Sequence, residues 1–430
     1  MVGDADGTRV RDPLRVYIVN QTAHWFIVGL TFPVLVLFVL DKGLDLLQAG
    51  IVLSGYSLAT IVLELPTGGL SDTIGRRKVY IMSLTVMLAG DIILLFAWDF
   101  PSTILAAVTL GAARALSSGS IEAWFIDEFK MKHPGGDLQR ALAKSGAMIP
   151  LGLGAGSLLG GLVPMSFGSL SVDTFSSHYG LNFAFAAFFV IVQIMLTLAL
   201  VRERHSLGRS GRFSDGVRKT PEMIATSVKY GVRNRVTFLL LLSTLALGFA
   251  LFSLELLWQP RVIELSSEAT GTWMLGVLAA GYFLASSVGS LASPLACRKF
   301  KGHYPNVLLL SRIGMGLSLV ILAMQGGLLG FSAVYLLVYF IVGMEDSPFS
   351  AIFNDQVPSK ARSTLISFRS LMLQLGGVAG AIIIGYLADA ASIPVAWTLA
   401  GAVLLVSAVA FAMLSRMDWR RENKDVGSID

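Results

Sequence analysis

Twelve long apolar blocks constrain the fold of this chain more than any other feature of its sequence. Each block holds about 20 residues, the length of helix that crosses a hydrocarbon core ~30 Å thick. Only helices and closed barrels satisfy their backbone groups in lipid, and blocks this long and apolar are typical of helices. The sequence therefore predicts an all-α polytopic membrane protein with twelve transmembrane helices. The predicted spans are residues 16–40, 46–67, 79–98, 102–125, 141–164, 181–201, 236–259, 272–296, 304–325, 331–353, 363–388 and 394–415.

Composition agrees with a membrane protein. Of the 430 residues, 54% are hydrophobic and only 14% are charged, whereas a soluble protein carries about 25% charged residues. Residues 1–15 are polar and the first apolar run is long, which argues against a signal peptide. A single cysteine, Cys297, and five histidines exclude an intramolecular disulfide and argue against a metal site. We expect no cofactor.

Basic residues predict the orientation of the helices. One set of loops and helix ends holds only Lys42 and Arg261. The opposite set holds Arg76, Arg77, Lys78, Lys130, Lys132, Arg140, Lys144, Arg202, Arg204, Arg298, Lys299, Lys301, Lys360, Arg362, Arg416 and Arg420. This asymmetry predicts that the basic side, with both termini, faces the cytoplasm. The net charge of +5 then reflects topology, and we expect no binding to nucleic acid.

A long polar stretch divides the chain into two parts. We predict an N-terminal six-helix bundle at residues 1–201, a cytoplasmic linker at 202–235 and a C-terminal six-helix bundle at 236–430. Within the linker, the segment from Pro221 to Arg235 either forms an amphipathic helix on the anionic leaflet or is a solvated basic connection that only enforces topology.

The two parts show a degenerate internal repeat. Glycines and basic residues recur in the same order at a nearly constant offset, which is the pattern of two pseudo-symmetric bundles with a site between them. The matching positions are Gly68, Leu70 and Asp72 with Gly289, Leu291 and Ser293; Gly152, Gly156 and Gly161 with Gly376, Gly380 and Gly385; and Arg140 with Arg362.

Several segments together resemble the major facilitator superfamily. The turn at 68–77 follows that family's Gly-x-Leu-x-Asp-x-x-Gly-Arg-Arg loop between helices 2 and 3. Further motifs resemble a large bacterial subgroup: Glu64-Leu65-Pro66-Thr67-Gly68 in helix 2, Arg114, Ser118, Gly119, Glu122, Ala123 and Asp127 in helix 4, and Arg362-Ser363-Thr364 in helix 11. The resemblance implies a transporter of the bacterial inner (cytoplasmic) membrane.

The turn between helices 2 and 3 is the predicted gate. By the family's logic, Asp72 faces the N-terminus of helix 11, where the helix dipole favours an anion. Gly68, Gly75, Arg76 and Arg77 complete the gate. For Arg77, as for the lysine that follows it, a plain positive-inside anchor is the alternative.

Helix 5 bears on the direction of transport. Gly152, Gly156, Gly160 and Gly161 resemble the antiporter motif of drug-exporting branches, but Ser157 replaces its proline. Small residues at this spacing also let two helices pack closely, and this interpretation needs no export role.

Four charged residues are candidates for proton coupling. Arg114 and Glu122 lie eight residues apart, so one continuous helix places them near one face. Charged groups inside a membrane are functional hypotheses by default. Glu122, Asp127 or Asp91 is predicted to bind and release a proton, with Arg114 competing for the carboxylate. The alternatives are a static buried ion pair for the helix 4 residues and an interhelical hydrogen bond for Asp91.

Polar and aromatic residues in the helices that line the cavity of this family are candidates for substrate binding. Their mixture suits a ligand with apolar and polar parts, including a cationic one. They are Asn20, Gln21, His24 and Trp25 in helix 1, Glu255, Trp258 and Gln259 in helix 7, and Glu345 and Asp346 in helix 10. Trp258 also suits an interfacial anchor, and His24 an interhelical hydrogen bond.

These features predict a monomeric, proton-coupled exporter of small amphiphilic molecules that works by alternating access among membrane lipids. An uptake carrier or uniporter of the same fold and a lipid flippase are the alternatives. The chain has no Gly-x-x-x-x-Gly-Lys-Ser/Thr loop, so ATP is not the expected energy source. No nucleophile–base motif indicates an enzyme.

Overall fold

Helices make up the whole regular structure of the described part of the chain. The computed structural model describes residues 12–68, 70–203, 234–266, 271–357 and 362–417. The side chains of residues 65, 66, 72, 73 and 362–364 lie outside this description. The predicted linker, with its Pro221–Arg235 segment, falls almost entirely outside it as well, so the domain boundaries stay predictions.

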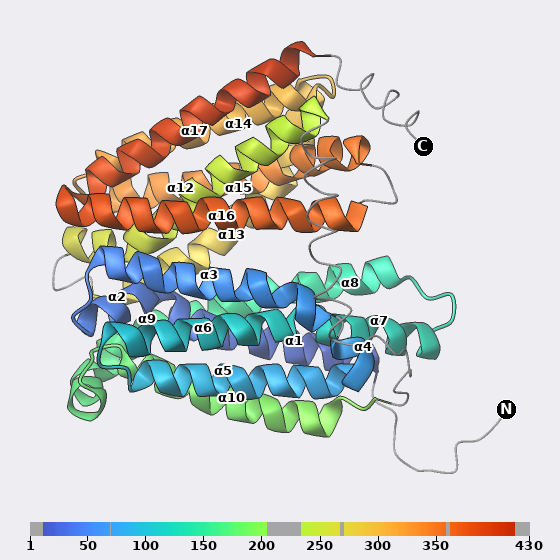
Figure 1. The fold of residues 1–430 in the computed structure, drawn as a ribbon, viewed down its shortest axis with the longest axis vertical. Coiled ribbons are helices and arrows are strands. Elements are labelled where there is room, and N and C mark those ends of the chain that lie inside the picture. The colour runs from blue at the N-terminus through green and yellow to red at the C-terminus, as the bar shows by residue number, and fades with distance from the viewer. Residues whose placement is uncertain (1–11, 69, 204–233, 267–270, 358–361, 418–430) are drawn as a thin grey trace.

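The helices before residue 204 pack into one bundle, which we call the first half (Figure 1). Its elements are α1 (Pro13–Thr31), η1 (Phe32–Val34), α2 (Leu35–Asp41), α3 (Leu46–Gly68), α4 (Leu70–Ile74), α5 (Arg76–Leu95), α6 (Phe100–Ser117), α7 (Ser120–Lys132), α8 (Leu138–Gly146), α9 (Met148–Phe175) and α10 (Gly180–Leu200).

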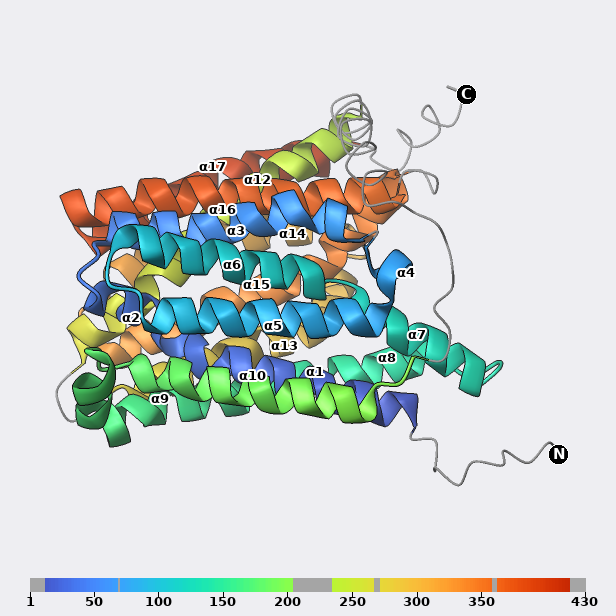
Figure 2. The ribbon, with the colours of Figure 1, turned by 60° about the horizontal axis from the view of Figure 1, so that its bottom comes forward.

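The helices after residue 233 pack into another bundle, the second half. Its elements are α12 (Arg235–Leu265), α13 (Trp273–Lys299), α14 (Tyr304–Ala323), α15 (Leu328–Gln356), α16 (Arg362–Ala390) and α17 (Ile393–Arg416). We call the end of the molecule where α1 begins and α17 ends the proximal end, and the opposite end the distal end (Figure 2).

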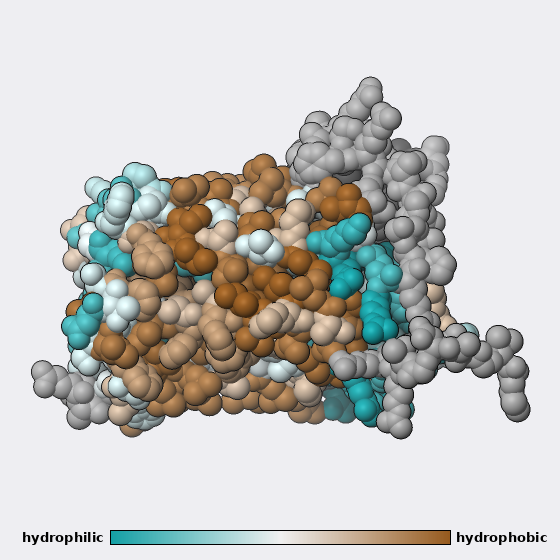
Figure 3. Space-filling model, turned by 90° about the horizontal axis from the view of Figure 1, so that it is seen from below, coloured by the Kyte–Doolittle hydropathy of each residue, from teal (hydrophilic) through white to brown (hydrophobic). Residues whose placement is uncertain are grey.

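In the part of the chain that the structure describes, twelve helical spans are long and apolar enough to cross a membrane, as the sequence predicts. Figure 3 shows the same property on the surface, where a broad hydrophobic band lies between more polar ends. Large apolar side chains such as Leu291 and Val406 are exposed on the molecular surface (79% and 72%). Such exposure suits a lipid-facing surface, because lipid tails are as apolar as the side chains.

Three predicted spans are interrupted, and the break in the fifth lies at Ala147, between α8 and α9. The first is broken by a turn of 3₁₀ helix at Phe32–Val34, where Pro33 cannot donate a backbone hydrogen bond. The fourth is broken between α6 and α7, where Gly119 adopts a left-handed conformation (φ 73°) that glycine tolerates best. The expectation that Arg114 and Glu122 share one face of a continuous helix is therefore wrong.

The two halves meet side by side along α3 with α16 and α9 with α13. Side chains of the second half bond to the backbone of the first at the distal end. The amide of Gln259 accepts from the N–H of Val36 (2.9 Å) and donates to the carbonyl of Phe32 (2.9 Å). Asp389 accepts from the N–H groups of Leu46 and Leu47 (3.2 and 2.7 Å) at the start of α3.

Toward the proximal end the halves spread apart (Figure 1). Among the described residues, two further hydrogen bonds join the halves: the Thr272 hydroxyl donates to the carbonyl of Gly161 (2.9 Å), and the Ser54 hydroxyl lies 3.4 Å from the carbonyl of Val378, within α3 and α16. The contact between the halves is thus concentrated at one end of the molecule.

Candidate substrate cavity

A cavity of about 340 Å³ lies where the two halves meet. Its walls come from α1, α2, α3, α5, α6 and α10 of the first half and from α12 and α16 of the second. Most lining side chains are apolar, among them Val28, Leu35, Val52 and Phe252. A volume of this size lies in the usual range for small-molecule sites, roughly 300–1,000 Å³.

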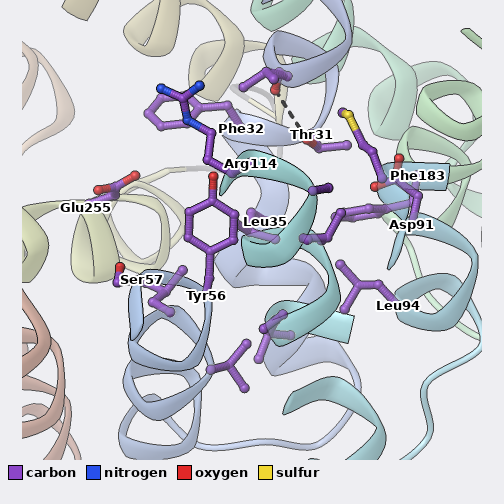
Figure 4. Close-up of a pocket in the computed structure, with 18 of the residues that line it drawn as sticks. Thr31, Phe32, Leu35, Tyr56, Ser57, Asp91, Leu94, Arg114, Phe183 and Glu255 are labelled. Atoms are coloured by element: carbon purple, nitrogen blue, oxygen red, sulfur yellow. Dashed lines mark hydrogen bonds between the residues drawn. The ribbon is translucent and has the colours of Figure 1, made fainter. Parts of the chain in front are cut away.

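Three polar side chains from three helices converge on one side of the cavity. Figure 4 shows Arg114 of α6, Tyr56 of α3 and Glu255 of α12 directed toward a shared space. Tyr56 interacts electrostatically with both charged groups. The face of the Arg114 guanidinium lies 5.8 Å from the Trp25 ring centre, close enough for a cation–π interaction. Opposite charges from the two halves therefore face one space.

A second region of the cavity extends into the interior of the first half. Asp91 of α5 lies there, 4% exposed, and Figure 4 places it near Phe183 and Leu94 and away from Glu255. Its Oδ2 atom is buried and accepts no hydrogen bond from the described residues. A buried ionised carboxylate without a partner is unfavourable, so this group needs either a proton or a cation.

The cavity that Glu255 lines also has Phe32, Tyr56 and Phe252 in its lining, and further aromatic rings outside the lining pack against Phe32. Tyr282 packs on Tyr339 (ring centres 3.9 Å apart), and Phe32 packs on Tyr282 (5.9 Å). Both tyrosines interact electrostatically with Glu255. Aromatic faces beside a carboxylate suit an organic cation.

The sequence and the fold have known counterparts. A family model described as the Major Facilitator Superfamily matches residues 18–344 and 264–428. The chain belongs to the major facilitator superfamily. Two solved structures of the nucleoside transporter NupG share the fold at 14% sequence identity. The match to a mutant form has a TM-score of 0.78 and covers 94% of this chain and 100% of NupG. The other has a TM-score of 0.77 and covers 95% and 100%. No curated protein matches the sequence.

Membership of this family makes the chain a membrane transporter and not an enzyme, as the sequence predicts. The structure describes most of the residues that the sequence predicts for the gate, for proton coupling and for substrate binding.

The signature loop joins α3 to α5 at the proximal end. Gly75 begins α5 with φ 103°, a backbone conformation that favours glycine. Arg76 forms an ion pair with Asp127 of α7, and its N–H donates to Glu203 (2.9 Å). Arg77 donates to the carbonyl of Leu198 (2.8 Å). These contacts fasten the loop within the first half.

The other half of the predicted gate lies outside the described residues. Asp72 belongs to α4, but its side chain is not described, and neither are residues 358–361 and the side chains that begin α16. Gly68 ends α3. The contact of Asp72 with helix 11 stays a prediction.

The proton-coupling candidates separate into two groups. Arg114 and Asp91 line the cavity. Glu122 and Asp127 belong to α7, beyond the break at Gly119, and are not among the lining residues. Asp127 pairs with Arg76, as described above.

Three of the nine predicted substrate residues line the cavity: His24, Trp25 and Glu255. The other six are not among the lining residues; five of them have polar groups that bond elsewhere, and Trp258 is buried with its ring N–H unbonded among the described residues. Asn20 accepts from Thr197, Gln21 donates to Tyr17, Trp258 is fully buried, Gln259 bonds the backbone near η1, Glu345 pairs with Arg312, and Asp346 pairs with Arg369.

The glycines of helix 5 sit at tight helix contacts. A Cβ at Gly152 would lie 2.6 Å from the carbonyl oxygen of Thr22, and one at Gly156 would clash with the carbonyl of Phe26. Gly160 faces Leu30 of α1 in the same way, whereas Gly161 faces Gly276 of the second half (2.6 Å). The motif thus packs α9 on α1 and contributes to the contact between halves.

Two functional features escaped the sequence analysis. Tyr56 gives no signal in the sequence, since a tyrosine in a membrane helix is ordinarily interpreted as an interfacial anchor. Arg312 is fully buried in α14 and was detectable as an arginine within an apolar run. It explains why Glu345 faces the interior of the second half.

Proposed function

We propose that this transporter exports small amphiphilic molecules in exchange for protons by alternating access. The observation that carries the proposal is the cavity itself. It lies between the halves, has a mostly apolar lining, and contains Arg114, Asp91 and Glu255, which have no hydrogen-bonded or ion-paired partner among the described residues. An amphiphilic cargo supplies apolar surface for such walls and a polar group for such charges.

The distribution of contacts supports the alternating-access part. The positive-inside rule places the proximal end in the cytoplasm. The contacts at Gln259, Asp389 and Thr272 then hold the outer side together, while the halves spread toward the cytoplasm. Rocking of the two bundles about the site would open the outer side and bring the halves together on the cytoplasmic side.

Asp91 is our candidate for the proton carrier. It lines the cavity and lacks a hydrogen-bond donor, so protonation removes an unpaired buried charge. Arg114 lines the same cavity and would favour loss of that proton in another arrangement of the halves. Asp127 is less suited, because it is occupied by Arg76.

An uptake carrier of the same fold is the second candidate. It gains support from Ser157, which replaces the proline of the antiporter motif and is fully buried. The neighbouring glycines are accounted for by packing. A carrier that moves its cargo inward would use the same cavity.

Proton flux and direction decide between the two. In inside-out vesicles with an acidic lumen, ethidium, phenylalanyl-phenylalanine or uridine should discharge part of the proton gradient. Asp91→Asn should abolish the discharge while probe binding persists. Asp346→Asn, an acid outside the cavity that pairs with Arg369, is the matched control. Accumulation in right-side-out vesicles without proton exit would instead establish uptake.

A further inference from the structure

We infer that the cavity binds a zwitterionic amphiphile, with its anionic group on Arg114, its cationic group on Glu255 and its apolar body along the shared lining. This inference rests on the proposed function for the cavity as the cargo site. It adds the charge pattern of the cargo.

Arg114 is oriented as an anion receptor. Its side chain is exposed and lines the cavity, and its Cζ atom lies over the Trp25 ring, 5.8 Å from the ring centre. A ring on the face leaves the N–H donors at the edge available, which is the geometry that recognises a carboxylate or phosphate. No side chain of the described residues accepts a hydrogen bond from Arg114.

Glu255 is the complementary group on the other half. It lines the same cavity and forms neither an ion pair nor a hydrogen bond with the described residues. Tyr282, Tyr339 and Tyr56 interact electrostatically with it. An organic ammonium group in this cavity therefore finds the Glu255 carboxylate and the aromatic lining residues Phe32, Tyr56 and Phe252.

The charges of the lining favour a cargo that carries both signs. With Asp91 protonated, as proposed above, one guanidinium and one carboxylate remain, and they come from opposite halves. A monocation would leave Arg114 without a partner, and a monoanion would leave Glu255 without one. Charges in a low-dielectric cavity are unfavourable unless paired, so a zwitterion satisfies the site best.

Direct pairing of Arg114 with Glu255 is the competing arrangement. The two groups form no ion pair here, and the Tyr56 hydroxyl is directed into the space they share (Figure 4). A zwitterion that contacts both would connect the halves through the cargo. Its binding would favour the arrangement in which the two charges lie at the separation the cargo requires.

The test compares three probes that share one dipeptide body and differ in which terminal charge they carry. Phenylalanyl-phenylalanine carries both charges, its methyl ester only the cation, and its N-acetyl derivative only the anion. Binding to the full chain in nanodiscs is measured by quenching of tryptophan fluorescence. We expect the dipeptide to bind about tenfold more tightly than either derivative, because each lacks one charged hydrogen bond.

Variants assign each charge to its partner. Glu255→Gln should abolish the advantage of the dipeptide over the N-acetyl derivative, and Arg114→Gln its advantage over the methyl ester. Glu264→Gln, on the same helix but paired with Arg261, should change neither. If a glutamine variant is not monodisperse, Glu255→Asp and Arg114→Lys should retain the order of the three probes.

A methyl ester that binds as tightly as the dipeptide would overturn the inference, as would the absence of binding by all three probes at millimolar concentration. Lysophosphatidylethanolamine carries the same two charges on a lipid. If it binds more tightly than the dipeptide with the same dependence on Arg114 and Glu255, the zwitterion is a lipid headgroup. Selective binding without proton flux would preserve the ligand class and remove the exchange mechanism.

Discussion

Corresponding helices of the two halves hold charged side chains within their spans, but among the described residues those of α14 and α15 pair with each other and those of α5 and α6 do not. In α14 and α15, Arg312 (0% exposed) and Glu345 (2%) form a buried ion pair. In α5 and α6 of the first half, Asp91 and Arg114 line a cavity and have no such partner. Asp91 precedes Arg312 by the same number of residues as Gly68 precedes Gly289, so the two occupy equivalent positions of the repeat.

The environment of the second pair shows what a structural charge requires. Arg312 also donates to the carbonyl of Ser243 (2.8 Å) and to the hydroxyl of Ser407 (3.1 Å), and it lies over the Phe411 ring. Nearly every donor thus has an acceptor, as buried charges need. Asp91 and Arg114, together with Glu255 of the second half, lack such partners among the described residues, and we propose that these three groups serve a cargo or a proton.

The largest expected effect is on the stability of the second half. Glu345→Gln or Arg312→Met should destabilise the protein by about 3–5 kcal/mol, because the remaining charge is buried without a partner. Replacing both with apolar residues should restore much of the loss. The apparent melting temperature of the purified protein measures both effects.

Asp91→Asn is the matching control in the first half and should change the melting temperature little. If Asp91→Asn destabilises the protein as much as Glu345→Gln does, Asp91 contributes to stability as much as the buried ion pair of the second half.

A smaller effect is expected where the backbones of the halves touch. Gly161→Ala should cost about 1–3 kcal/mol, since its Cβ would meet the backbone nitrogen of Gly276 at 2.6 Å. Gly154→Ala is the control, because its Cβ would lie 3.9 Å from Ala280. Equal melting temperatures for the two variants would show that the halves do not meet here through close backbone contact.

The smallest expected effect is on the contact between the halves at the distal end. The second half contributes the side chains of Gln259 and Asp389, and the first half contributes backbone groups. Asp389→Ala should reduce the free energy that favours contact between the halves at the distal end by about 1–2 kcal/mol. The distance between the halves should therefore increase there. The measurement is the distance between spin labels at Trp98 and Leu329, two exposed distal positions (80% and 87%), with Cys297→Ser removing the native thiol.

Asp45→Ala is the control for this measurement. Asp45 lies at the same end but bonds Gln48 within the first half. A longer distance in both variants would mean that the distal end responds to any loss of an acid there.

The sequence predicted the spans because hydrophobic length depends on local composition, and lipid imposes it directly. The predicted block 304–325 corresponds to helix Tyr304–Ala323. The breaks within the first and fourth spans were harder to predict from the sequence. Pro33 lies inside a span that remains apolar on both sides, and Gly119 looks like any other glycine of a membrane helix until its φ of 73° is known.

The candidate site was harder to predict, because it depends on which way each helix faces. Glu255 and Glu345 both lie in apolar runs, yet one lines the cavity and the other pairs with Arg312. Their difference is set by helix rotation, which packing between distant segments determines. Tyr56 enters the site only because α3 and α12 meet across the halves.

The break in the first span has a consequence for biosynthesis. The Val36 N–H and the Phe32 carbonyl are bonded by Gln259, which lies more than 220 residues later in the chain. When the first half enters the membrane during synthesis, these groups have no Gln259 to bond with, and unsatisfied backbone in lipid is costly. The first helix of the protein therefore reaches its final hydrogen bonding only after the seventh has been inserted.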